Sequence, residues 1–222
     1  MTYSQIESTP HRDVVIVGGG PSLLGWDLSP LCKRCYVLVV NNAVWKLPAA
    51  AGFITADMRW AEHYQDRLIA EFAGEKFIVA PEDSALRCLP GISYLRHSTE
   101  LGLCDRADTV KVRGSSGYAA INAACLLGAK RIWLLGFDMA APGRHWFGTY
   151  PWKSAIDDSI FASWIAEFRT LAASLCAAGV SVTNVGMGSK LDCFPKQDIS
   201  DYFGWVHETQ RKHLNNRDQH NC

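Results

Sequence analysis

Short, unbroken runs of apolar residues recur along the chain, and segments in which apolar residues fall three or four apart separate several of them. Unbroken runs are typical of strands covered on both faces, as in a parallel sheet, whereas the wider spacing is typical of helices. The runs predict strands at residues 13–17, 36–40, 53–57, 76–80, 92–95, 109–112, 131–138 and 180–184.

Two helices are predicted in the first two thirds of the chain. In the first, Asp57 is the expected N-cap, apolar side chains recur every four residues from Trp60 to Phe72, and Gly74 stands at the expected C-cap. The second helix is rich in alanine and covers residues 115–128. Its small side chains favour close packing against a sheet.

A third helix is the clearest amphipathic segment, from residue 156 to residue 179, and capping-box spacing over residues 154–157 precedes it. A short final helix is expected beyond residue 195. The alternation of strands and helices predicts an α/β fold, Rossmann-like and doubly wound, with a mostly parallel sheet.

The length of 222 residues suits one domain of this class. We expect a flexible N-terminus over residues 1–12, a nucleotide-binding domain over 13–214 and a polar tail over 215–222. Lys plus Arg equals Asp plus Glu at 22 each, so the net charge is zero. The charge therefore gives no indication of nucleic-acid binding. The sequence predicts no membrane span and no signal peptide, which favours a cytoplasmic location; it leaves the oligomeric state open.

The eight cysteines include one C-x-x-C pair, Cys32 and Cys35. No second pair or histidine pair accompanies them at metal-ligand spacing, and Cys35 begins an apolar run. We expect reduced thiols and no metal site.

The first apolar run ends in Gly18, Gly19, Gly20, Pro21 and Ser22, a pattern typical of a strand, a tight turn and the first turn of a helix. Such a turn brings backbone N–H groups close to an anion, and a helix N-terminus favours negative charge. The alternative is a tight turn that binds nothing.

The glycine turn departs from the dinucleotide pattern G-x-G-x-x-G, because Leu23 takes the place of the third glycine. Asn41 and Asn42 stand where a dehydrogenase carries the acid that binds ribose. The sequence therefore argues against NAD and favours a mononucleotide.

Further candidates lie where other predicted strands end or helices begin. Ser115, Ser116 and Gly117 open the alanine-rich helix and suit an anion, although a plain N-cap would explain them equally. Asp138 follows an apolar run and either serves the site or caps a turn. Because ligands of doubly wound sheets bind outside the carboxyl ends of the strands, these residues, Asp57 and the glycine turn are expected on one rim.

His145 lies in a loop rich in glycine and aromatic residues, next to Trp146 and before Tyr150 and Trp152. An imidazole with a pKa near 6.5 suits general acid–base chemistry, and the aromatic rings suit stacking on a base or sugar. The alternatives are an exposed histidine and rings that pack the loop down. The other histidines lack metal-ligand spacing, and no nucleophile elbow occurs.

The segments Val15–Leu23 and Ser115–Asp138 together resemble a Rossmann-like superfamily. It joins bacterial lipooligosaccharide sialyltransferases, flagellin-modifying nonulosonic acid transferases and 6-hydroxymethylpterin diphosphokinase-like proteins; short phage-encoded proteins carry the same pair of motifs. In the sialyltransferases the glycine turn and an Asn after the second strand hold the nucleotide of the sugar donor. Here Gly19 replaces the Asn of the first motif, and Asn41 or Asn42 matches the second.

The same resemblance aligns Ser116-Gly117 with the family's helix start and His145-Trp-Phe-Gly148 with its H-Y-x-G motif, which carries a general-base histidine. The spacing from Asp138 to His145 is shorter than in those enzymes. The resemblance implies a metal-independent glycosyltransferase that uses a nucleotide-activated sugar and needs no cofactor, with His145 as base. Two alternatives stay open: a Mg²⁺- and ATP-dependent diphosphokinase using Asp57 or Asp138, and a non-catalytic nucleotide-binding protein of phage origin.

Overall fold

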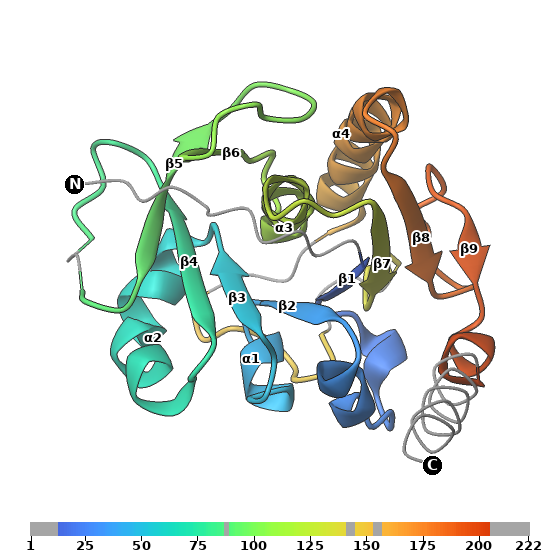
Figure 1. Ribbon diagram of the computed structural model, residues 1–222, viewed down its shortest axis with the longest axis horizontal. Coiled ribbons are helices and arrows are strands. Elements are labelled where there is room, and N and C mark those ends of the chain that lie inside the picture. The colour runs from blue at the N-terminus through green and yellow to red at the C-terminus, as the bar shows by residue number, and fades with distance from the viewer. Residues whose placement is uncertain (1–12, 87–88, 141–144, 153–156, 205–222) are drawn as a thin grey trace, which may run out of the picture.

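In the part of the chain that the structure describes, nine strands form one sheet in the order β6-β5-β4-β3-β2-β1-β7-β8-β9, and every neighbouring pair is parallel (Figure 1). The computed structural model describes residues 13–86, 89–140, 145–152 and 157–204. The predicted N-terminal segment, the polar tail and Ser154 of the capping box lie outside these residues. The prediction of a mostly parallel, Rossmann-like sheet is confirmed.

The strands fall close to the predicted apolar runs. They are β1 (Asp13–Val17), β2 (Tyr36–Val40), β3 (Gly52–Thr55), β4 (Glu75–Ala80), β5 (Ser93–Ser98), β6 (Thr109–Lys111), β7 (Arg131–Leu135), β8 (Ser181–Val185) and β9 (Lys196–Gln197). The prediction stopped β5 three residues early and continued β7 three residues too far. It missed β9, which has two residues and no apolar run.

The helical segments are η1 (Pro21–Leu23) and η2 (Ser29–Lys33), both 3-10 helices, and the α-helices α1 (Ala43–Lys46), α2 (Met58–Glu71), α3 (Ser116–Leu126) and α4 (Asp158–Ala177). Residues 199–204 are helical too, where a short final helix was predicted. The first helical turn predicted after the glycines is a 3-10 turn, η1, of three residues. Helix α4 begins two residues later than predicted, since Asp157 is its N-cap.

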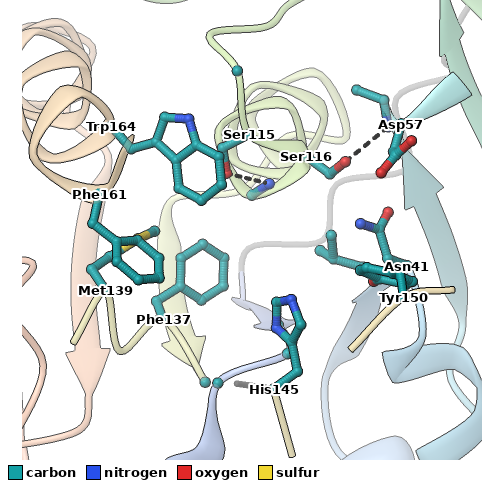
Figure 2. Close-up of a pocket in the computed structure, with 18 of the residues that line it drawn as sticks. Asn41, Asp57, Ser115, Ser116, Phe137, Met139, His145, Tyr150, Phe161 and Trp164 are labelled. Atoms are coloured by element: carbon teal, nitrogen blue, oxygen red, sulfur yellow. Dashed lines mark hydrogen bonds between the residues drawn. The ribbon is translucent and has the colours of Figure 1, made fainter. Parts of the chain in front are cut away.

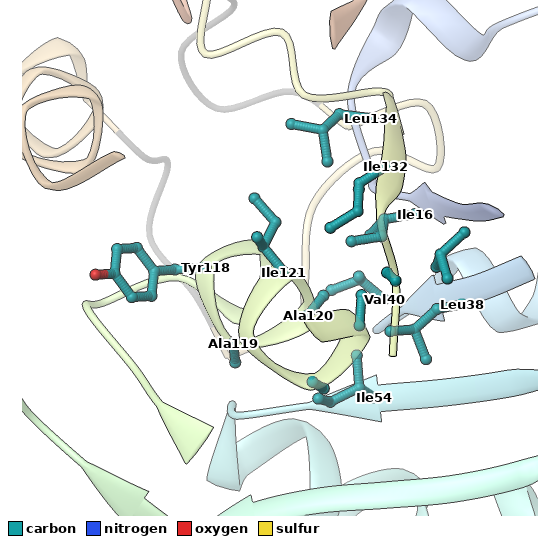
Figure 3. Packing of buried hydrophobic residues seen from close by; sticks show 14 of the residues in the cluster. Ile16, Leu38, Val40, Ile54, Tyr118, Ala119, Ala120, Ile121, Ile132 and Leu134 are labelled. Carbon is teal, nitrogen blue, oxygen red and sulfur yellow. The ribbon is translucent and has the colours of Figure 1, made fainter. Parts of the chain in front are cut away.

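Two layers of helices cover the two faces of the sheet (Figure 1). Alternate strand residues divide between them: Val14 and Ile16 pack with α3 and α4, and Val15 and Val17 pack with α1 and α2. Helix α3 is buried from Gly117 to Ala124 because small side chains bring its backbone close to the sheet. Figure 3 shows this packing around Ala120 and Ile121.

Strand β1 lies at the point where the strand order reverses. The chain runs outward from β1 to β6 on one side, and it returns through α3 to place β7 on the other side of β1. Val17 pairs with Leu135, so the turns after β1 and β7 leave the sheet side by side. In doubly wound sheets this point opens a crevice at the carboxyl ends of the strands.

Helix α4 is long and apolar enough to cross a membrane by length and composition, a test that core helices also pass. Phe168, Leu171 and Leu175 of this helix pack into the core. Ion pairs join Glu167 to Arg113 and Arg169 to Asp192. These contacts hold one face of α4 against the domain, although only 17% of its apolar 18-residue window is buried.

Candidate functional site

A cavity of about 550 Å³ lies at the carboxyl edge of the sheet, where β1 meets β7 (Figure 2). Segments that follow β1, β2, β3, β6 and β7 contribute to its lining, together with a residue near the end of β5. The residues predicted from sequence that line it are Gly18, Gly19, Gly20, Pro21, Asn41, Asp57, Ser115, Ser116, Gly117, Asp138 and His145. Ser22 and Asn42 are not among the lining residues.

The glycine turn uses several of its own backbone amides. Gly18 N–H donates to the carbonyl of Leu135 at 2.8 Å, and Gly20 N–H donates to the carbonyl of Gly136 at 2.9 Å. The amide and hydroxyl of Ser22 both donate to the carboxylate of Asp138, at 2.8 and 2.5 Å. Asp138 therefore ties the turn after β1 to the turn after β7.

Close packing explains the glycines of this turn. A methyl group on Gly20 would lie 2.6 Å from Cγ of Asp138 and from the carbonyl oxygen of Gly136. One on Gly19 would lie 2.8 Å from Nδ1 of His145. The amides of Gly18, Gly20 and Ser22 already donate to protein acceptors, and the carboxylate of Asp138 lies against the turn. These contacts argue against the prediction that the amides of the glycine turn bind a phosphate.

Asn41 and Asn42 lie in different surroundings and have different roles. Asn41 has a φ of 52°; its side chain hydrogen-bonds to Tyr150, but its buried Oδ1 has no hydrogen-bond partner among the described residues. Asn42 accepts a hydrogen bond from the indole of Trp60 at 2.7 Å and lies in the protein interior. Asn41 is thus the asparagine that could bind a ligand, and Asn42 positions α2.

Helices α2 and α3 both begin at the cavity. Asp57 caps α2 by accepting from the amide of Trp60 at 3.2 Å. Ser115 caps α3 by accepting from the amide of Gly117 at 3.1 Å, and the hydroxyl of Ser116 accepts from the amide of Ala56, also at 3.1 Å (Figure 2). The two predicted N-caps are confirmed, and Ser116 connects the two helix starts.

His145 lies over the glycine turn in a loop with aromatic contacts. Its ring stacks on Phe147 with the centroids 4.7 Å apart, and the amide of Trp146 donates to the carbonyl of Gly19 at 3.0 Å. This stacking and this hydrogen bond hold the imidazole at the cavity wall.

Burial raises the pKa of the nearby Tyr150 hydroxyl, against the lowering effect of hydrogen bonds with Asn41 and Asn42.

The other rings of this loop mainly pack it down. Trp146 lies under the ammonium group of Lys46, 5.2 Å from its ring centroid. The ring of Trp152 lies 4.9 Å from that of His63 on α2. Tyr150 and Trp152 also line the cavity, where stacking on a base or sugar stays a prediction.

The structure adds two polar lining residues that the sequence analysis did not select. His97 lies at the end of β5; burial lowers its pKa, and a hydrogen bond with the backbone of Val112 acts in the opposite direction. Arg59, in the first turn of α2, donates to the carbonyl of Trp152 at 3.2 Å and supplies the cationic side chain of the described lining. Extending β5 to Ser98 would have placed His97 at the ligand edge.

The thiols of the C-x-x-C pair lie outside the cavity. Burial raises the pKa of Cys35 to about 12 and also raises that of Cys32. No group of three or more potential metal ligands occurs among the described residues. Metal binding and redox chemistry at this pair are therefore poorly supported.

The fold is similar to a solved structure, the MAf glycosyltransferase from Magnetospirillum magneticum AMB-1, with a TM-score of 0.56 and 14% identity. The similarity covers 88% of this chain and 35% of the other, so the chain spans about a third of that protein's length. Comparisons with known protein families and with curated sequences found no match. At this identity, the likeness is one of fold: a glycosyltransferase-like α/β fold.

Proposed function

We propose that the protein is a nucleotide-binding transferase, a glycosyltransferase that uses a nucleotide-activated sugar. The main support is the position of the cavity at the switch point of the sheet, with the unpartnered Oδ1 of Asn41 in its lining. Burying an acceptor without a donor costs free energy, which an N–H or O–H group of a ligand would offset. The similarity to a glycosyltransferase structure favours this class of reaction.

In the proposed reaction, His145 accepts the proton of an acceptor hydroxyl. The acceptor oxygen forms a bond to the anomeric carbon of the sugar, and the bond from that carbon to the phosphate oxygen breaks. The nucleotide leaves with the electron pair. Ser115, Ser116 and the guanidinium of Arg59 line the same cavity and would hold its phosphate, in place of the occupied amides of the glycine turn.

Titration calorimetry with CMP, UDP, GDP and ATP tests nucleotide binding. We expect one of them to bind the intact protein, and Asn41→Ala to weaken that binding through loss of the buried acceptor. Ser181→Ala, in the exposed first position of β8, is the control that should bind unchanged. No binding of any of the four at millimolar concentration would exclude the proposal.

Substitution of His145 tests the general base. We expect His145→Gln and His145→Ala to lower turnover of the donor sugar about 10²- to 10⁴-fold while nucleotide affinity stays within about twofold. Full turnover in either variant would remove His145 from the mechanism. A chelator should spare the activity, whereas loss of activity on chelation would favour the diphosphokinase alternative.

A further inference from the structure

The cavity has one apolar side. Phe137 and Met139 come from the segment after β7, and Phe161 and Trp164 come from the first two turns of α4 (Figure 2). We call these four residues the apolar wall. The rings of Phe161 and Trp164 lie 5.7 Å apart and nearly perpendicular, at 76°. They form a corner in which one ring presents its face and the other its edge.

The apolar wall is fixed by glycines and by the core. A methyl group on Gly117 would lie 2.6 Å from the ring of Phe137, so α3 approaches this ring closely. A methyl group on Gly114, whose φ is +60°, would lie 2.6 Å from Nε1 of Trp164. The wall therefore exists before any ligand binds.

Met139 has a φ of 49°, a conformation that is unfavourable for a side chain of this kind. Among the described residues other than glycine, only Asn41 shares a positive φ, and it lines the same cavity. Backbone strain of this kind concentrates at ligand sites. Met139 therefore carries backbone strain on the apolar side, whereas asparagine adopts this conformation readily.

The two sides suit different chemical groups. The four wall side chains offer no oxygen acceptor, so a ring with polar groups on several sides would lose more hydrogen bonds there than a flat ring with a single hydroxyl. Asn41, Asp57 and Ser116 on the other side offer acceptors and a hydroxyl. Figure 2 shows His145 between the two sides. The polar side therefore suits the nucleotide sugar, and the wall suits a flat carbon ring.

We propose that the acceptor is an aromatic alcohol of the phenol or indole class, whose ring lies in the corner of Phe161 and Trp164 with its hydroxyl toward His145. The assignment of this compound as acceptor rests on the proposed transferase function. The affinity of the wall for a flat apolar ring follows from the lining alone. A sugar acceptor would leave its hydroxyls against this wall without partners.

Titration calorimetry with 4-methylphenol tests the wall, with methyl α-galactoside as the sugar probe and CMP, UDP, GDP and ATP as nucleotide probes. We expect 4-methylphenol to bind and the galactoside not to bind. Phe161→Ala should lower the affinity for 4-methylphenol about fivefold or more and leave the affinity for nucleotide within about twofold of that of the intact protein. Ile160→Ala is the matched control, because Ile160 is exposed and lies outside the lining.

Each alternative result has a distinct meaning. Nucleotide binding without 4-methylphenol binding would overturn this inference and leave the proposed function standing. Equal 4-methylphenol affinity in Phe161→Ala and the intact protein would also overturn it. Binding of 4-methylphenol without any nucleotide would exclude the transferase and keep the apolar ring site. Galactoside binding that Phe161→Ala abolishes would assign the wall to sugars instead.

Trp164→Phe provides a second test, because it keeps an aromatic ring in the corner. We expect this variant to retain 4-methylphenol affinity within about threefold and Trp164→Leu to lose more. Equal affinities of the two variants would contradict stacking as the mode of binding. A thermal melt of each variant separates loss of the site from loss of the fold.

Discussion

Gly20 is a residue whose neighbours, rather than its backbone conformation, require glycine. Its φ of −65° and ψ of 145° are accessible to any residue. The added methyl group of Gly20→Ala would meet the backbone oxygen of Gly136 and the carboxylate of Asp138. The contact between the turns after β1 and β7 would then have to open.

We therefore expect Gly20→Ala to lower the free energy of unfolding by about 1–3 kcal/mol, the usual range for overpacking. Gly188→Ala is the control, because no atom lies within 4 Å of its added methyl group. Urea denaturation of both variants measures the difference. Equal stabilities of the two variants would show that the contact between the turns after β1 and β7 accommodates the added methyl group without a measurable loss of stability.

His97 gives the stability a pH dependence of defined sign. Burial lowers the pKa of His97 in the folded protein below its ordinary value of 6.5. The unfolded chain therefore takes up a proton at pH values where the folded protein does not, and stability falls as the pH drops below about 6.5. Above that pH, His97 is neutral in both the folded and the unfolded chain, and the stability loss is absent.

We expect His97→Asn to lose less stability between pH 7 and pH 5 than the intact protein. Asparagine keeps a donor for the Val112 backbone and does not titrate in this range. Urea denaturation at both pH values provides the measurement. A variant that loses as much stability as the intact protein would show that His97 does not carry this dependence.

Site residues were predictable from sequence where they directly follow a strand. Asn41 and Asp57 follow β2 and β3 closely, so the rule for carboxyl ends places them correctly. The use of the glycine amides by Leu135 and Gly136 was not predictable, because those partners are distant in sequence. Phe161 and Trp164 of the apolar wall were missed for the same reason, because they reach the cavity through the packing of α4.

At the scale of elements, the starts of helices could be predicted most directly from the sequence. Asp57 was predicted as an N-cap from its position before a four-residue repeat, and its carboxylate accepts from the amide of Trp60. Two elements without such signals were missed: α1 is a single turn, and β9 pairs with β8 through Lys196 and Gln197. Their conformation depends on neighbours already in place.

The N-cap of α2 can be tested by a pair of variants. We expect Asp57→Ala to lower the free energy of unfolding by about 1 kcal/mol, because the first turn of α2 loses an acceptor. Asp57→Asn keeps an acceptor oxygen and should be close to the intact protein. Chemical denaturation without ligand compares the three proteins. Equal losses in both variants would assign the effect to the charge instead.

At the scale of the whole molecule, burial divides the thiols into two reactivity classes. It raises the pKa of Cys35 and Cys125 to about 12, and the thiolate is the nucleophile in alkylation. Cys176 is exposed on α4. Because the raised pKa keeps a thiol protonated, Cys35 and Cys125 should be nearly unreactive at pH 8.

Iodoacetamide at pH 8 followed by peptide mass spectrometry measures this difference. We expect Cys176 to be modified while Cys35 and Cys125 stay unmodified in the folded protein, and all three to react in urea. Rapid modification of Cys35 in the native protein would contradict its burial and reopen a role for the C-x-x-C pair.

The position of β1 between β2 and β7 also constrains how the chain folds. Its partner β2 follows closely in sequence, whereas Asp13 and Arg131, which pair at the other edge, are 118 residues apart. Closing so long a loop is slow, and an unpaired central edge is prone to aggregation meanwhile. During synthesis, one edge of β1 therefore stays unpaired until β7 has emerged from the ribosome.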